Sequence, residues 1–145
     1  MLDPKKTELS ELYATHMARF VGGFSKLLAR YDLTDSQYRL LQIVKKEGRQ
    51  SCSRIAEAMD VTLSAVTNLS NKLVKKRYIE RIVPENDRRT TFLQITDEGE
   101  RIVQQMIDKY KVVSEGMWTN FTETEIELLI GCYRKLIANM ERLDK

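Results

Sequence analysis

The sequence predicts a mainly helical protein of the α+β class, with one small β-hairpin between its helices. Apolar residues recur at helical three- and four-residue spacing along most of the 145 residues. Two short segments rich in β-branched and aromatic residues, 78–83 and 91–95, flank the turn-forming sequence 84–87. Hydrophobic residues make up 42% of the chain and charged residues 31%, which is typical of a globular protein rather than a disordered chain.

The first two helices are expected over residues 8–31 and from Thr34 to about Glu47. The first carries a long apolar stripe at helical spacing. Thr34 is followed three residues later by Gln37, which predicts a capping box at the start of the second helix. Gly48 stands where a glycine commonly ends a helix.

Two further helices are expected before the hairpin. A short third helix begins at Ser51 or Ser53, and a brief turn at 60–61 leads to Thr62, a good N-cap for the fourth. The fourth helix is expected to bury Leu63, Val66, Leu69, Leu73 and Val74. Its outer face carries small, polar or basic side chains: Ser64, Ala65, Thr67, Asn68, Asn71, Lys72 and Lys75.

Two long helices are expected after the hairpin. Thr96 caps the first of them, with Gly99 inside its first turn, and Thr122 with Glu125 forms a capping box at the start of the last. The first and last helices of the chain carry apolar stripes that are too wide for the short segment between them to cover. We therefore expect them to pack on a second copy of the chain; the alternative is a monomer in which they pack on each other.

The charge is unevenly distributed. The whole chain carries +3, whereas the stretch from Val61 to Thr90 has seven basic and three acidic side chains and carries +4, so the remainder sums to −1. A basic segment in a near-neutral protein is the electrostatic signature of a polyanionic partner.

Several function classes have little support. No apolar run approaches the roughly 18–20 residues that span a membrane, and the N-terminal residues lack the apolar core of a signal peptide, so a cytoplasmic protein is expected. Cys52 and Cys132 lack metal-ligand spacing, and His16 is the only histidine. No phosphate-binding glycine loop or nucleophile elbow is present. We expect no enzyme activity, no cofactor and no metal.

A short helix, a tight turn, a helix with a polar outer face and a basic hairpin together form the pattern of a winged helix-turn-helix. A helix fits the major groove, where each base pair has a distinct pattern of donors and acceptors. An arginine-tipped hairpin can enter the minor groove, where narrow A·T stretches concentrate negative potential. The sequence therefore predicts a protein that binds double-stranded DNA; the alternative is a winged-helix protein-interaction module that does not bind DNA.

The motifs also follow one another in a specific order. Asp87-Arg88-Arg89 comes after the helix-turn-helix pattern and directly before Leu93-Gln94-Ile95-Thr96-Asp97-Glu98-Gly99. Upstream lie Ile55-Ala56-Glu57-Ala58-Met59, Ser64-Ala65-Val66-Thr67-Asn68-Leu69, Leu73-Val74-Lys75-Lys76 and Tyr78-Ile79-Glu80-Arg81. With the long flanking helices, nearly the whole chain resembles the MarR family of bacterial transcription regulators.

The resemblance implies a domain organisation and a mode of action. Residues 34–96, called the reading head below, would form the winged helix-turn-helix, and residues 1–33 and 97–145 a helical dimerisation region, all within one compact domain. A homodimer would act on an inverted repeat with half-sites about one DNA turn (~34–36 Å) apart. Repression is the expected effect.

The resemblance also implies roles for single residues. Arg89 would enter the minor groove, Asp87 would hold it through a salt bridge, and Arg88 would contact phosphate. The major-groove face would comprise Ser64, Ala65, Thr67, Asn68 and Lys72. Asn68 could read an adenine edge through a bidentate contact. A solvated turn at the hairpin tip and a solvated Asn68 are the alternatives.

Two positions depart from the family pattern. Asn68 stands where many members have arginine, so a base preference cannot be transferred from relatives. Arg77 stands where a glycine commonly ends the recognition helix, and a left-handed conformation costs a non-glycine residue roughly 1 kcal/mol. Either the helix ends differently here, or Arg77 contacts a phosphate.

Relatives often respond to small phenolic or other apolar effectors. Five side chains could line a cavity for such a ligand: Tyr13, His16, Phe20, Tyr31 and Tyr38. Helically spaced aromatic residues are more often ordinary core, and a hydrogen-bonded core position is the preferred interpretation for His16. Cys52 starts a helix, where a low thiol pKa is possible, but we interpret both cysteines as packing residues and expect no oxidation sensor.

Overall fold

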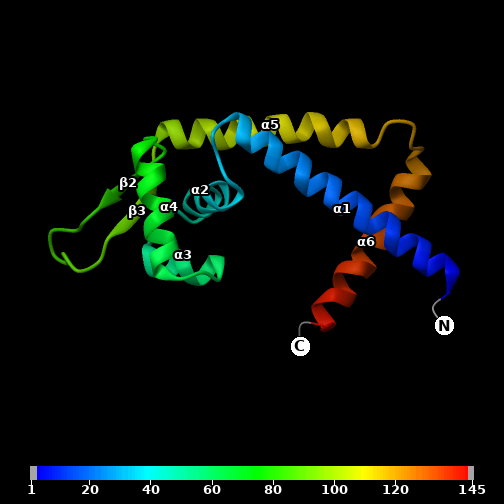
Figure 1. Cartoon of the computed structure of the whole chain (residues 1–145), viewed down its shortest axis with the longest axis horizontal. Coiled ribbons are helices and arrows are strands. Elements are labelled where there is room, and N and C mark those ends of the chain that lie inside the picture. Colours follow the sequence, from blue (N-terminus) through cyan, green and yellow to red (C-terminus); the bar gives the residue numbers. More distant parts are fainter. Residues whose placement is uncertain (1–2, 144–145) are drawn as a thin grey trace. The chain divides into compact units, whose positions relative to one another are not determined.

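Helices dominate the chain, and three short strands form one small antiparallel sheet. The computed structural model describes residues 3–143 (Figure 1) and confirms the predicted mainly α, α+β architecture. The elements are α1 (Pro4–Arg30), α2 (Asp35–Glu47), β1 (Gln50–Ser51), α3 (Cys52–Met59), α4 (Leu63–Lys75), β2 (Ile79–Ile82), β3 (Phe92–Ile95), α5 (Asp97–Met117) and α6 (Glu123–Leu143). They divide into two units, Met1–Lys109 and Tyr110–Lys145.

The core of the first unit lies between the C-terminal end of α1, helices α2 to α4, the sheet and the first turns of α5. Its fully buried side chains include Leu28, Leu40, Leu41, Val44, Ile55, Val66, Leu73, Ile79, Leu93, Val103 and Met106. Most of the expected apolar stripes of α2, α3 and α4 supply this core. The β2–β3 hairpin extends away from α4 as the wing (Figure 1).

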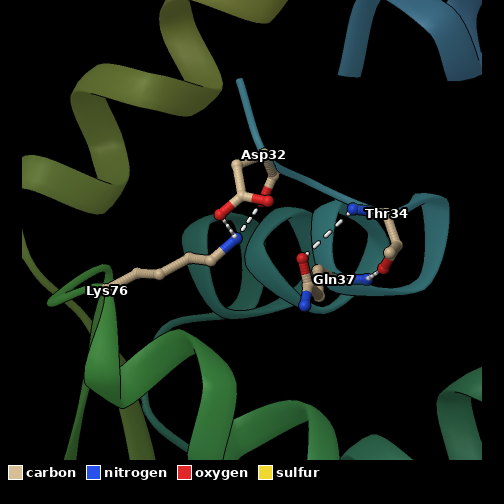
Figure 2. Close-up of polar contacts among 4 residues, drawn as sticks. All are labelled: Asp32, Thr34, Gln37 and Lys76. Atoms are coloured by element: carbon tan, nitrogen blue, oxygen red, sulfur yellow. Dashed lines mark hydrogen bonds and ion pairs between the residues drawn. The ribbon is translucent and has the colours of Figure 1, made fainter. Parts of the chain in front are cut away.

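The predicted helix starts are confirmed at three caps. The Gln37 amide N–H donates to Thr34 Oγ1 (3.2 Å) and the Thr34 N–H donates to Gln37 Oε1 (3.1 Å), which completes the capping box (Figure 2). Ser51 rather than Ser53 caps α3. Thr62 caps α4 by accepting the Ala65 N–H at 3.1 Å.

Two elements differ from the expectation. Helix α1 begins at Pro4, four residues before the predicted start, because Asp3 caps it by accepting the Lys5 N–H at 2.9 Å. The sheet has a third strand, β1, giving the order β1-β3-β2, with Ser51 opposite Phe92. Two residues are too few to produce an alternating pattern in the sequence.

The prediction that Leu63 is a core residue is wrong, because its side chain is 53% exposed. Leu63 is the first residue of α4 and lies one turn before Val66, where the buried stripe of the helix begins. The buried face contains Ser70 instead, which is completely inaccessible. Its hydroxyl donates to the Val66 carbonyl at 2.6 Å, so the buried polar group is satisfied.

The end of α4 has the geometry of a glycine-terminated helix without the glycine. Arg77 has a φ of +62°, its N–H donates to the Val74 carbonyl (2.9 Å), and the Tyr78 N–H donates to the Leu73 carbonyl (3.0 Å). The other non-glycine residues with positive φ among residues 3–143 are Asp32, Asp60 and Asn120, types that tolerate this conformation. The alternative that α4 ends without a left-handed residue is therefore wrong. Arg77 itself adopts the strained left-handed conformation.

Helix α5 begins directly against this turn. Thr96 accepts the Gly99 N–H on Oγ1 (3.1 Å), while the same hydroxyl donates to the Arg77 carbonyl (2.6 Å). The Thr96 N–H donates to the Tyr78 carbonyl at 3.0 Å. A Cβ at Gly99 would overlap the Tyr78 carbonyl oxygen and lie 2.8 Å from Ile95 Cγ1. Only glycine allows this approach.

A lysine fixes the other side of the same turn. Lys76 Nζ lies 3.1 Å from Asp32 Oδ2 and also donates to the Asp32 carbonyl oxygen (Figure 2). Asp32 ends α1 with a φ of +54°, and the following residue, Leu33, donates its N–H to the Leu28 carbonyl at 3.0 Å. The α4–β2 turn is thus tied to the α1–α2 turn.

The second unit contains the C-terminal turns of α5 and all of α6. The predicted capping box at its start is confirmed, because the Glu125 N–H donates to Thr122 Oγ1 (3.2 Å) and the Thr122 N–H donates to Glu125 Oε2 (2.8 Å). No residue of α6 is buried. Among the helices in residues 3–143, none is long and apolar enough to span a membrane.

We predict that Gly99→Ala destabilises the protein by about 1–3 kcal/mol, because the added methyl group forces α5 away from the α4–β2 turn. The control is Gly116→Ala, also on α5, where a Cβ meets no atom within 4 Å. This control should leave the free energy of unfolding unchanged or raise it by roughly 0.5–1 kcal/mol. Urea denaturation measures both, and equal stability of Gly99→Ala and the wild type would contradict the prediction.

Candidate nucleic-acid interface

The outer face of α4 is polar and open to solvent over its first turns. Ser64, Thr67 and Asn68 are exposed, and so is Lys72 one turn later, whereas Ala65 is half-buried. The Thr67 hydroxyl donates to the Leu63 carbonyl at 3.0 Å, so its oxygen remains as an acceptor. Four of the five side chains predicted to face the major groove are therefore accessible.

The wing is joined to α4 by a residue that the sequence analysis did not single out. Arg81, on β2 opposite Leu93 of β3, donates from Nη2 to Asn71 Oδ1 on α4. This contact sets the hairpin against the exposed side of the helix. A basic residue in the middle of a short strand was the available signal, but its partner on α4 could be identified only from the fold.

At the wing tip, the expected salt bridge between Asp87 and Arg89 is absent from the ion pairs of residues 3–143. Asp87 instead accepts the Arg89 backbone N–H on Oδ1 (3.0 Å) and the Thr90 hydroxyl on Oδ2 (3.0 Å). The Asp87 N–H donates to the Pro84 carbonyl at 3.3 Å. A carboxylate two residues before an N–H favours this local turn over a side-chain pair. Asp87 shapes the tip and leaves the Arg89 guanidinium unpaired.

The exposed cations follow α4 and the wing. Lys72, Lys75 and Arg77 are exposed toward the end of the helix, and Arg88 and Arg89 are exposed at the wing tip. Lys76 differs, since its side chain is only 23% exposed and is held by Asp32. Both elements that carry the predicted contacts therefore display unpaired positive charge among the described residues, as a phosphate-binding surface requires.

The five candidate ligand residues differ in their surroundings. Tyr38 is buried and its ring packs edge-on against Phe24, with centroids 5.4 Å apart, so the core interpretation holds for it. Tyr31 is half-buried against the same core, and Tyr13 is exposed. A cavity of about 660 Å³ in this unit is lined by other residues: Ala29, Asp32, Leu33, Thr34, Gln37, Lys72, Lys75 and Lys76.

His16 does not match the preferred interpretation of a hydrogen-bonded core residue. Its Nε2 atom is buried and has no hydrogen-bond partner within residues 3–143. The imidazole lies edge-on to the Phe20 ring, with centroids 6.2 Å apart. The Nε2 nitrogen is therefore available to a hydrogen-bonding group from outside the described chain.

The two cysteines lie in different environments. Burial raises the pKa of the Cys52 thiol, and the positive charge of Arg81 offsets this only in part. Cys132 is exposed on α6, so the interpretation of it as a packing residue is wrong for the described chain, and neither cysteine forms a disulfide there. No group of three or more metal-binding side chains occurs in the described part of the chain.

We predict that Arg77→Gly has opposite effects on stability and on DNA affinity. Relief of the left-handed strain should stabilise the fold by about 1 kcal/mol. Loss of the guanidinium should weaken binding to all DNA sequences alike, as expected for a phosphate contact. Arg77→Lys keeps both the strain and the charge and serves as the control. Thermal denaturation and fluorescence anisotropy measure the two effects; unchanged affinity in Arg77→Gly would exclude the phosphate contact.

Comparison with known proteins also points to the MarR family. Residues 33–91 match the family model described as MarR family. The transcriptional repressor MdtR of Bacillus subtilis is 32% identical over 99 residues, which cover 68% of this chain and 64% of MdtR.

Solved structures share the fold over almost the whole chain. The YusO protein of B. subtilis has a TM-score of 0.87 and 25% identity, covering 95% of this chain and 98% of YusO. The F27L mutant of MepR from S. aureus, bound to an oligodeoxyribonucleotide, has a TM-score of 0.75 and 21% identity, covering 91% and 97% of the two chains. The motif order, the winged-helix fold and these matches show that the chain belongs to the MarR family of DNA-binding transcriptional regulators.

Proposed function

We propose that this protein is a repressor that binds an inverted repeat in double-stranded DNA as a homodimer and is released by a small apolar or phenolic effector. One observation carries the proposal: the exposed polar face of α4 and the unpaired arginines of the wing belong to elements that Arg81 and Asn71 tie together. A rigid link between the two elements lets one surface engage two grooves at once.

The first turns of α4 enter the major groove in this proposal. Ser64 and Thr67 are small, so the helix backbone can approach the bases closely. The exposed Asn68 amide can make a bidentate contact with adenine. Lys72 and Arg77, farther along the same helix and just after it, bind phosphates and fix the orientation of the helix in the groove.

The wing acts in the minor groove. The backbone turn that Asp87 stabilises presents Arg89 without an ion pair among residues 3–143, so insertion into the groove breaks no salt bridge there. Arg88 lies beside it and binds phosphate. A narrow minor groove, with its enhanced negative potential, favours such an arginine over bulk solvent.

The helical region formed by residues 1–33 and 97–145 supplies the dimer interface. Large apolar side chains on these helices are exposed in the isolated chain: Leu9, Leu12, Val21, Val112, Val113, Leu128, Leu136, Ile137 and Met140. Apolar surface of this extent is unusual on a monomer and is normally covered by a partner. Two-fold symmetry would place two copies of α4 about one DNA turn apart, at roughly 34–36 Å.

Repression is proposed from a relative, and release by an effector from one side chain. MdtR, which is 32% identical, is described as a transcriptional repressor. The buried, unpaired Nε2 of His16 beside Phe20 offers a hydrogen bond to the hydroxyl of a phenolic ligand. Of the five candidate ligand residues, we therefore retain His16 and Phe20 as the residues that bind the effector.

We predict that selection from a random duplex pool at near-physiological salt enriches an inverted repeat with half-site centres about 10 base pairs apart. Arg89→Ala should weaken binding to every sequence, because the wing loses its groove contact, while sedimentation shows an unchanged dimer. Arg101→Ala is the control, since Arg101 is also exposed but lies on α5 and pairs with Glu98.

The result of the selection distinguishes a dimeric DNA-binding regulator from a protein-interaction module. Enrichment of an inverted repeat, lost in Arg89→Ala and kept in Arg101→Ala, supports the dimeric regulator. No enrichment with the purified protein, with or without an added phenolic ligand, would contradict the proposal and favour a winged helix that binds another protein.

A further inference from the structure

Exposed large apolar residues are rare in the reading head. Outside it, such residues cover the helices of the proposed dimer region. Within residues 34–96, only Val61, Leu63 and Val83 are large apolar residues with exposed side chains. Two of them flank Thr62, the cap of the recognition helix, and the third stands at the base of the wing tip. Exposed large apolar side chains in the reading head are therefore confined to the start of α4, with the turn before it, and to the loop of the wing.

Leu63 is the most exposed of the three and has a fixed position. It is the first residue of α4, held there by the Thr62 cap on the Ala65 N–H. Its side chain is 53% exposed and lies outside the core cluster. Thr67 lies one turn later on the same side of the helix and anchors its hydroxyl on the Leu63 carbonyl. Leu63 is thus an exposed apolar side chain at the start of the helix, next to the polar Ser64.

The chemistry of the major groove offers one match for such a side chain. Base edges there present nitrogen and oxygen donors and acceptors, and the only apolar group is the C5-methyl of thymine. We propose that Leu63 is a specificity-determining residue that contacts a thymine methyl in each half-site. The proposal rests on the docking of α4 in the major groove proposed above.

The surroundings favour DNA over a protein as the occupant. The neighbouring exposed residues on α4 are polar or basic, namely Ser64, Thr67, Asn68, Asn71 and Lys72. A protein interface needs a contiguous patch much larger than one or two side chains. The exposed large apolar side chains at the start of α4 are Val61 and Leu63 alone, and so small an apolar area within a polar, cationic surface suits contact with a methyl group.

The experiment compares thymine with uracil, which lacks the C5-methyl group. The duplex obtained by selection with the wild-type protein is resynthesised with uracil at one thymine position at a time, and affinity is measured by fluorescence anisotropy. At the contacted position, the wild type should lose about fourfold per methyl group, the equivalent of one buried methylene. Thymines outside the half-sites serve as the control.

Variants assign the effect to Leu63. Leu63→Ala should bind the thymine and uracil duplexes equally, and Leu63→Met, which keeps the apolar volume, should restore the preference for thymine. Because Leu63 is exposed, both variants should fold with wild-type stability, and circular dichroism checks this.

The inference fails if the wild type binds the selected duplex but tolerates uracil at every half-site position, or if Leu63→Ala keeps the thymine preference. A Leu63→Ala variant that loses its dimer would also overturn it, since Leu63 would then belong to a protein interface. These results differ from failure of the proposed function, in which no duplex is bound at all.

Discussion

The contact on which the reading head depends is the close approach of α5 to the α4–β2 turn. Gly99 leaves room for the Tyr78 carbonyl, and the Thr96 hydroxyl donates to the Arg77 carbonyl while capping α5. On the opposite side, Lys76 ties the turn to Asp32. Because backbone contacts of this kind are short and directional, the turn has little freedom, and the end of the recognition helix is fixed relative to the first residues of the wing.

This constraint explains why a strained residue is tolerated there. Arg77 holds a left-handed conformation at a cost of roughly 1 kcal/mol, and the two helix-ending hydrogen bonds to Val74 and Leu73 offset it. The same turn passes directly into β2, where Arg81 reaches back to Asn71. Helix α4 and the wing are therefore positioned by one short stretch of backbone and by the Arg81–Asn71 hydrogen bond.

Local signals in the sequence predicted most of this arrangement, whereas tertiary relations were missed. The caps at Thr34, Thr62 and Thr122 are local side-chain chemistry and could be predicted directly. Periodicity placed Leu63 in the core because spacing carries no information on where a partner element ends. The strand at Gln50–Ser51 exists only through pairing with β3. At the wing tip, Asp87 was assigned to the Arg89 side chain although the nearer backbone N–H competes for it.

The central claim is that α4 and the wing form one phosphate-binding surface in each subunit of a dimer. The salt dependence of DNA affinity tests it most directly, since each neutralised phosphate adds about 0.9 to the slope of log affinity against log salt concentration. With exposed Lys72, Arg77 and Arg88 in both subunits, the account predicts a slope of about −5. A slope near zero would show that these cations do not meet DNA and would contradict the account.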